Sequence, residues 1–113
     1  MKHPFVNLLA AAALSGAAGA LAAEGNAAAG AEKNSMCAGC HGIPGYKTAF
    51  PEVYTVPKIG GQHASYIVKA LQAYKSGQRT HPSMRAIAAT LSEQDMADLA
   101  AYYATAQSQS AAK

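Results

Sequence analysis

Apolar residues along most of this chain are spaced as in amphipathic helices. Between residues 62 and 76 they recur at i, i+4, i+5 and i+8, which places them on one helix face. The residues of this face are Tyr66, Ile67, Ala70, Leu71 and Tyr74. Gln62 or His63 begins the predicted helix, and Gly77 occupies the position that glycine commonly takes just past a helix end.

Three other segments also have helical character. Residues 26–38 are rich in alanine and can use Asn26 as an N-cap. A short helix is predicted over residues 85–90. Residues 92–95, Ser-Glu-Gln-Asp, have the form of a capping box at the start of a last helix, which we expect to fray from Gln107 onward. The apolar stripe of this helix contains Met96, Leu99, Ala100 and Tyr103.

Residues 42–56 lack helical periodicity and contain several glycine, proline and aromatic residues, so we expect a loop there. No segment has the alternation of apolar and polar residues that is typical of a half-buried strand. The predicted fold class is therefore all-α, with about four helices and connecting loops.

The N-terminal segment has the pattern of a secretory signal peptide. A lysine and a histidine precede an apolar stretch over residues 5–14, and residues 20–22, Ala-Leu-Ala, have the small-x-small form of a cleavage site. We expect cleavage after Ala22 or Ala23. A retained membrane anchor is the alternative, but the apolar stretch falls well short of the ~20 strongly hydrophobic residues that span a bilayer.

Removal of residues 1–22 from the 113-residue chain leaves residues 23–113, enough for one small domain with an ordered core over about residues 25–105. Its eight basic and six acidic residues give a net charge of only +2, which does not favour nucleic-acid binding. A chain of 91 residues buries a thin core, and such domains commonly need a covalent or metal-bound staple.

The run Cys37-Ala38-Gly39-Cys40-His41 contains the only two cysteines of the chain. Cys-x-x-Cys-His is the attachment motif of c-type haem, in which each sulfur adds to one vinyl group and the histidine binds the iron from the proximal side. A thioredoxin-like dithiol would need a βαβ context, and a zinc site would need a second pair of ligands. A structural disulfide would leave His41 without a role. One covalent haem c is therefore predicted.

The sixth position of the iron can stay open or take a second histidine or a methionine. Met84 lies in an irregular segment between two predicted helices, from which its side chain can fold over the distal face. His81 and His63 are the competing ligands. Met96 belongs to the apolar stripe of the last helix, where a core role is expected. Met36 directly precedes the attachment motif and cannot reach the opposite face.

Residues 25–105 resemble a class I c-type cytochrome, in particular the small monohaem periplasmic cytochromes of bacteria. The resemblance rests on segments that occur in the family's order, namely residues 37–42, 56–62, 74–79, 84–88 and 91–102. It implies the cytochrome c fold, in which about four helices and loops wrap around one covalently attached haem. It also implies axial ligation of the iron by His41 and Met84.

The resemblance carries three further expectations. The carbonyl group of Pro57 should accept a hydrogen bond from His41, and Arg79 is a candidate partner for a haem propionate. Many relatives carry an aromatic residue four positions after the glycine that matches Gly30. This chain has Asn34 there, so the packing between the first and last helices should differ.

The predicted function is single-electron transfer by a soluble periplasmic protein, because an iron with both axial positions filled has no open site for substrate. No nucleophile with an adjacent base is recognisable, so no enzymatic activity is expected. The expected partners are a membrane quinol-oxidising complex or a dehydrogenase as electron donor and a terminal oxidase or reductase as acceptor, without nucleic-acid binding or stable membrane insertion. The alternatives are an electron-transfer subunit of a periplasmic oxidoreductase and a gas-binding or peroxidatic haem protein.

Overall fold

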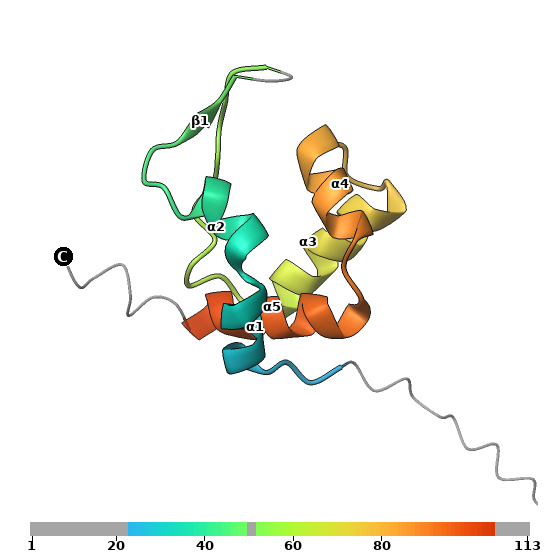
Figure 1. Cartoon of the computed structure of the whole chain (residues 1–113). Coiled ribbons are helices and arrows are strands. Elements are labelled where there is room, and N and C mark those ends of the chain that lie inside the picture. The colour runs from blue at the N-terminus through green and yellow to red at the C-terminus, as the bar shows by residue number, and fades with distance from the viewer. Residues whose placement is uncertain (1–22, 50–51, 106–113) are drawn as a thin grey trace, which may run out of the picture.

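The computed structural model describes residues 23–49 and 52–105, in which two arms extend from a common base (Figure 1). At the base, helix α1 (Ala27–Lys33) packs across helix α5 (Glu93–Thr105). The expected signal peptide and the predicted frayed tail lie outside the described residues. Within the described residues, no helix is long and apolar enough to cross a membrane.

One arm consists of helix α2 (Ser35–His41) and an antiparallel hairpin of strands β1 (Lys47–Thr48) and β2 (Tyr54–Thr55). The other arm consists of helices α3 (Ala64–Ser76) and α4 (Pro82–Ala89), which pack on each other, while α3 also packs on α5. The described chain is thus mostly helical with one very small sheet, and the predicted all-α class is confirmed.

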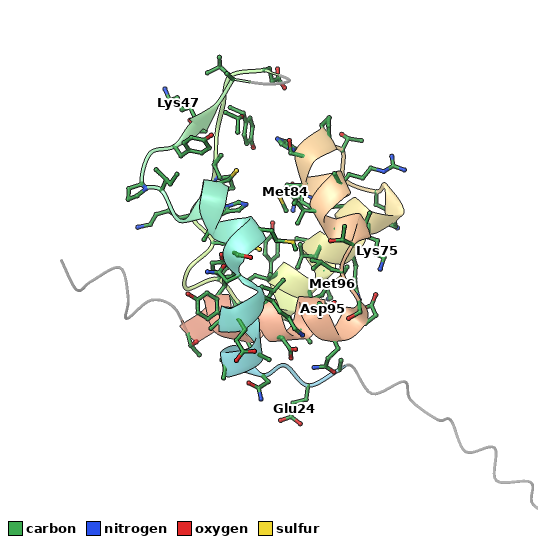
Figure 2. All side chains as sticks on the ribbon, in the orientation of Figure 1. Glu24, Lys47, Lys75, Met84, Asp95 and Met96 are labelled. Carbon is green, nitrogen blue, oxygen red and sulfur yellow. The ribbon has the colours of Figure 1, made fainter. Side chains whose placement is uncertain are left out.

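The core is built around α5. Met96, Leu99 and Ala100 have at most 1% of their surface exposed, so the core position predicted for Met96 is confirmed. Leu71 of α3 and Cys37 of α2 both contact this core, and the α2 arm is therefore fixed to α5 through the first cysteine of the attachment motif. Figure 2 shows Met96 on α5 at the base, while Met84 of α4 lies higher in the view.

The crossing of α1 and α5 depends on a close backbone approach and a buried carboxylate. A Cβ atom at Gly30 would overlap the carbonyl group of Asp98, so only glycine permits this separation of the helices. The Asp98 carboxylate is almost fully buried and accepts hydrogen bonds from the backbone N–H of Asn26 (2.9 Å), from Gln94 (2.8 Å) and from the ammonium group of Lys33 (2.7 Å). These bonds hold the pKa of Asp98 at about 2, below its usual value, with Lys33 as the main cause.

The predicted helix ends were largely correct. Asn26 caps α1 by accepting the backbone N–H groups of Ala28 and Ala29. Gly77 follows α3 in the left-handed conformation (φ 84°), as glycine does at this position. At the start of α5, the side chains of Ser92 and Asp95 each accept a backbone N–H from the other residue, as in a capping box.

Three local predictions were wrong. The single helix predicted over residues 26–38 is two helices, because the chain tightens at Asn34, whose N–H donates to the carbonyl of Ala31 at 3.4 Å. The predicted loop over residues 42–56 contains the β1–β2 hairpin, with Thr48 paired to Tyr54. The helix predicted over residues 85–90 begins earlier, at Pro82, so Met84 lies in the first turn of α4 and not in an irregular segment.

Candidate functional site

Helix α2 carries all three residues of the Cys-x-x-Cys-His motif. Cys37 and Cys40 are three residues apart, so they lie on the same side of the helix about one turn from each other, and both are half-buried free thiols. His41 is the last residue of α2, where the helix ends at Gly42. Helix α2 therefore carries the sulfur of Cys37 on one turn and the sulfur of Cys40 and the imidazole of His41 on the next.

The orientation of the His41 ring is set from outside its own helix. Its Nδ1 atom lies 2.7 Å from the carbonyl oxygen of Pro57, which confirms the expected hydrogen bond. Because a carbonyl can only accept, Nδ1 carries the proton and the lone pair of the neutral ring is on Nε2. This is the arrangement of a metal-binding histidine whose second nitrogen is held by a backbone carbonyl.

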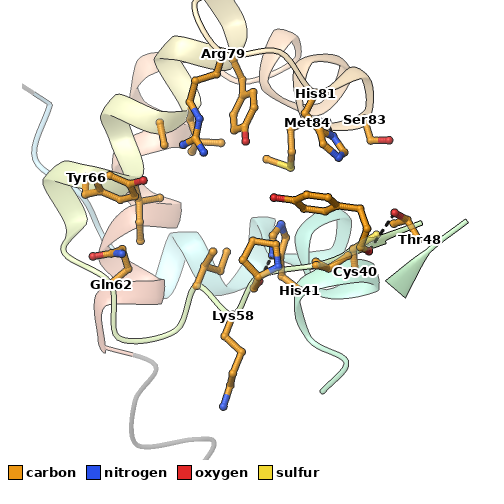
Figure 3. A pocket seen from close by; sticks show the side chains of 18 residues that line it. Cys40, His41, Thr48, Lys58, Gln62, Tyr66, Arg79, His81, Ser83 and Met84 are labelled. Carbon is orange, nitrogen blue, oxygen red and sulfur yellow. Dashed lines mark hydrogen bonds between the residues drawn. The ribbon is translucent and has the colours of Figure 1, made fainter. Parts of the chain in front are cut away.

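A cavity of about 370 Å³ lies between the two arms. Its walls are mainly apolar and come from the segment after the hairpin and from α3; they include Val56, Pro57, Ile59, Ile67, Leu71 and Tyr74. Cys40 and His41 line it from α2, and Met84 lines it from α4. Figure 3 shows the sulfur end of Met84 and the ring of His41 entering the cavity from opposite sides.

Met84 is positioned by the N-terminus of α4. Pro82 occupies the first turn, and the backbone N–H of Met84 donates to Nδ1 of His81 at 3.4 Å, which makes His81 the N-cap. His81 also lines the cavity, and its ring packs against Tyr54 with centroids 5.6 Å apart. Since its Nδ1 accepts a hydrogen bond, the neutral ring carries its proton on Nε2 and has no free lone pair for a metal.

The remaining predicted site residues are placed as follows. His63 is the exposed N-cap of α3 and does not line the cavity. Arg79 lines the cavity with its guanidinium 4.7 Å from the ring centroid of Tyr74, so it puts a positive charge at the cavity edge. Cys37 is not among the lining residues and packs instead against α3 and α5.

The environment of Cys37 is relevant to the alternative of a redox dithiol. Burial raises the pKa of the Cys37 thiol, and the neighbouring Tyr103 hydroxyl opposes this shift only in part. The reactive cysteine of a thioredoxin-like dithiol has a lowered pKa. The surroundings of Cys37 therefore do not fit that class of site.

The sequence did not identify the hairpin as part of the site. Thr48 and Tyr54 line the cavity, and Tyr54 contacts His81 across it. The only sequence feature of this segment was a cluster of glycine, proline and aromatic residues between 42 and 56. This feature predicted a loop and did not indicate that the segment lines the cavity. The hairpin thus forms the wall of the cavity opposite α4.

These residues fit a covalent haem. Cys40 lines the cavity, and Cys37 lies about one turn earlier on the same side of α2. With an imidazole whose Nε2 is free, a thioether sulfur on the opposite side and an apolar wall between these two groups, they make up the donor set and surroundings of haem c with iron. The fold and the cavity define the class of protein as a c-type cytochrome.

Comparison with known proteins gives the family. The family model for cytochrome c matches residues 22–107, so the chain belongs to the cytochrome c family and is a class I c-type cytochrome with covalent haem c. It is 40% identical over 90 residues to cytochrome c4 of Pseudomonas aeruginosa, covering 80% of this chain and 43% of that protein. It is also 40% identical over 84 residues to cytochrome c-554(548) of Halomonas halodenitrificans, covering 72% of this chain and 96% of that protein.

A third relative carries a functional name. The chain is 38% identical over 65 residues to the thiosulfate dehydrogenase electron acceptor of Stutzerimonas stutzeri, covering 58% of this chain and 29% of that protein. The chain spans less than half the length of this protein and of the cytochromes c4 it matches. The relatives together support an electron-transfer role for this c-type cytochrome.

Proposed function

We propose that this protein is a periplasmic electron carrier with one haem c, bound through Cys37 and Cys40 and ligated axially by His41 and Met84. The observation that carries the proposal is the placement of the Met84 sulfur and the His41 ring on opposite sides of one cavity (Figure 3). The bound haem supplies a one-electron couple between ferrous and ferric iron.

The protein's own residues determine how that couple behaves. An iron held by His41 on one side and Met84 on the other would have no position left for a substrate, which favours outer-sphere electron transfer over catalysis. Ligation by Met84 and the apolar wall, which includes Val56, Ile59 and Leu71, would both favour the less charged ferrous state of the haem and raise its reduction potential. Arg79 can hold a propionate at the cavity edge by a charge-assisted hydrogen bond.

The localisation and partners belong to the same proposal. We infer that residues 1–22 are a signal peptide that delivers residues 23–113 to the periplasm, where the haem is attached. A dehydrogenase is a suitable electron donor, and the name of the Stutzerimonas relative, an electron acceptor of thiosulfate dehydrogenase, supports this class of donor. A quinol-oxidising membrane complex is the other donor class, with a terminal oxidase or reductase as acceptor.

The decisive experiment replaces Met84 by alanine in the holoprotein. Met84→Ala should open the sixth position, convert ferric iron to high spin, allow the ferrous form to bind carbon monoxide, and lower the reduction potential. Met36→Leu is the matched control, because Met36 is 45% exposed and does not line the cavity. This control should keep the spectrum and the potential of the parent protein.

Two results would overturn the proposal. If His81→Ala produced the high-spin form and Met84→Ala did not, the axial assignment would be wrong. If the unmodified protein bound carbon monoxide readily or turned over peroxide while folded, the gas-binding or peroxidatic alternative would replace the electron carrier.

A further inference from the structure

Asn34 connects the two helices of the N-terminal half through its backbone. It is the C-cap of α1 and the N-cap of α2, in a right-handed helical conformation. Its carbonyl oxygen accepts the N–H groups of both Cys37 and Ala38, each at 2.9 Å. Any change in the backbone orientation of Asn34 is therefore transmitted directly to Cys37.

The side chain of Asn34 is held by α5. Its Oδ1 accepts a hydrogen bond from the hydroxyl of Tyr103, and its Nδ2 lies 3.5 Å from the hydroxyl of Tyr102. The two tyrosines pack edge to face, with ring centroids 5.1 Å apart. This short polar network joins the junction of α1 and α2 to helix α5.

Tyr103 is also next to the first cysteine of the motif. Its side chain is 8% exposed and packs in the core with Ile67 and Ala100, and Cys37 contacts the same cluster. A hydroxyl at this depth needs a partner, because burial without one costs free energy. Asn34 supplies that partner, so Tyr103 bonds to the start of α2 and belongs to the cluster against which Cys37 packs.

We propose that Asn34 and Tyr103 form a positioning pair that fixes helix α2, and with it Cys37, against α5. The proposal rests on the attachment of haem through Cys37 proposed above. Because a hydrogen bond is directional, the pair sets the angle of α2 as well as its distance from α5. Loosening the pair should admit water beside the thioether and lower the reduction potential, because a more polar surrounding favours ferric iron.

The test measures native-state amide hydrogen exchange and reduction potential in the purified holoprotein. Tyr103→Phe keeps the ring and removes the hydroxyl, and Asn34→Ala removes the acceptor. Each should raise the exchange rates of the Cys37 and Ala38 amides about tenfold relative to the interior amides of α3, and each should lower the potential. Tyr102→Phe is the matched control, since the Tyr102 hydroxyl makes only the long contact with Asn34. It should change the ratio of the Cys37 and Ala38 exchange rates to those of the interior α3 amides by less than twofold.

The double variant identifies the pair. If Asn34 and Tyr103 act together, the variant that combines Asn34→Ala with Tyr103→Phe should raise the exchange rates as much as one single variant does. Independent residues would instead raise them by the product of the two single increases. A uniform rise of exchange in all helices, an unchanged potential, or multiplicative effects in the double variant would overturn the proposal. Peptide mass spectrometry of the haem-bearing segment tests attachment at Cys37 separately, so failure of the pair and failure of the attachment assignment are distinguishable.

Discussion

Nδ1 of His41 and the carbonyl oxygen of Pro57 lie 2.7 Å apart, although the two residues are 16 positions apart in the sequence. The intervening chain contains the whole hairpin, which leaves α2 and returns beside it. This one hydrogen bond therefore fixes the tautomer of His41 and also places the segment after the hairpin against α2.

The tautomer of His41 is the first testable consequence. In the reduced holoprotein, nitrogen NMR should place the proton of His41 on Nδ1, with Nε2 bound to iron. Pro57→Ala should preserve the Nδ1 proton, because the acceptor is a backbone carbonyl that alanine also has. A proton found on Nε2 would contradict both the bond and the proximal assignment.

The two cysteines give the second prediction. In the variant with both Cys37→Ala and Cys40→Ala, the protein should be colourless and largely unfolded, because the described core is thin and the haem would complete it. Cys37→Ala alone should keep a haem on one thioether, with a shifted visible band. Acid–acetone extraction and far-ultraviolet circular dichroism measure these outcomes. A haem that is extracted from the parent protein would show that it is not covalent.

Several features were predictable because they depend on local chemistry. The caps at Asn26 and Gly77 and the apolar stripe through Met96 are determined by residues a few positions apart, and all three were predicted correctly. The break at Asn34 was not predictable in this way. Alanine-rich helix propensity alone favours a continuous helix, and the side chain of Asn34 contacts tyrosines of α5 that lie 68 and 69 residues later, which local propensity does not register.

The start of α4 was missed for a different reason. Pro82 is well suited to the first turn of a helix, and this indication was present in the sequence. The N-cap before it is His81, which is not among the residue types that usually cap a helix, so local capping rules do not mark this start. The identity of Met84 as the candidate ligand did not depend on this error, since the first turn of α4 also brings Met84 to the cavity.

The third prediction compares two glycines in neighbouring helices. Gly30→Ala should destabilise the holoprotein by about 1–3 kcal/mol, because the new Cβ would overlap the Asp98 carbonyl and force α1 away from α5. Gly39→Ala, whose Cβ would meet nothing within 4 Å, should be neutral or stabilising by up to ~1 kcal/mol through helix propensity. Guanidinium unfolding measures both. Equal effects at the two positions would mean that the close crossing is not needed.

The last prediction concerns the pH dependence that Asp98 confers. Its pKa is about 2 in the folded protein, against roughly 3.9 in an unfolded chain, so its contribution to stability is complete above about pH 4 and is lost as pH falls towards 2. Asp98→Asn should therefore lower the thermal midpoint at pH 6, and the difference from the parent protein should shrink between pH 4 and pH 2. Comparing the two proteins at each pH removes contributions common to both. Lys33→Gln should raise the Asp98 pKa, because Lys33 is the main cause of the shift. A difference between the parent and Asp98→Asn that stays constant down to pH 2 would mean that the carboxylate's charge does not stabilise the α1–α5 crossing.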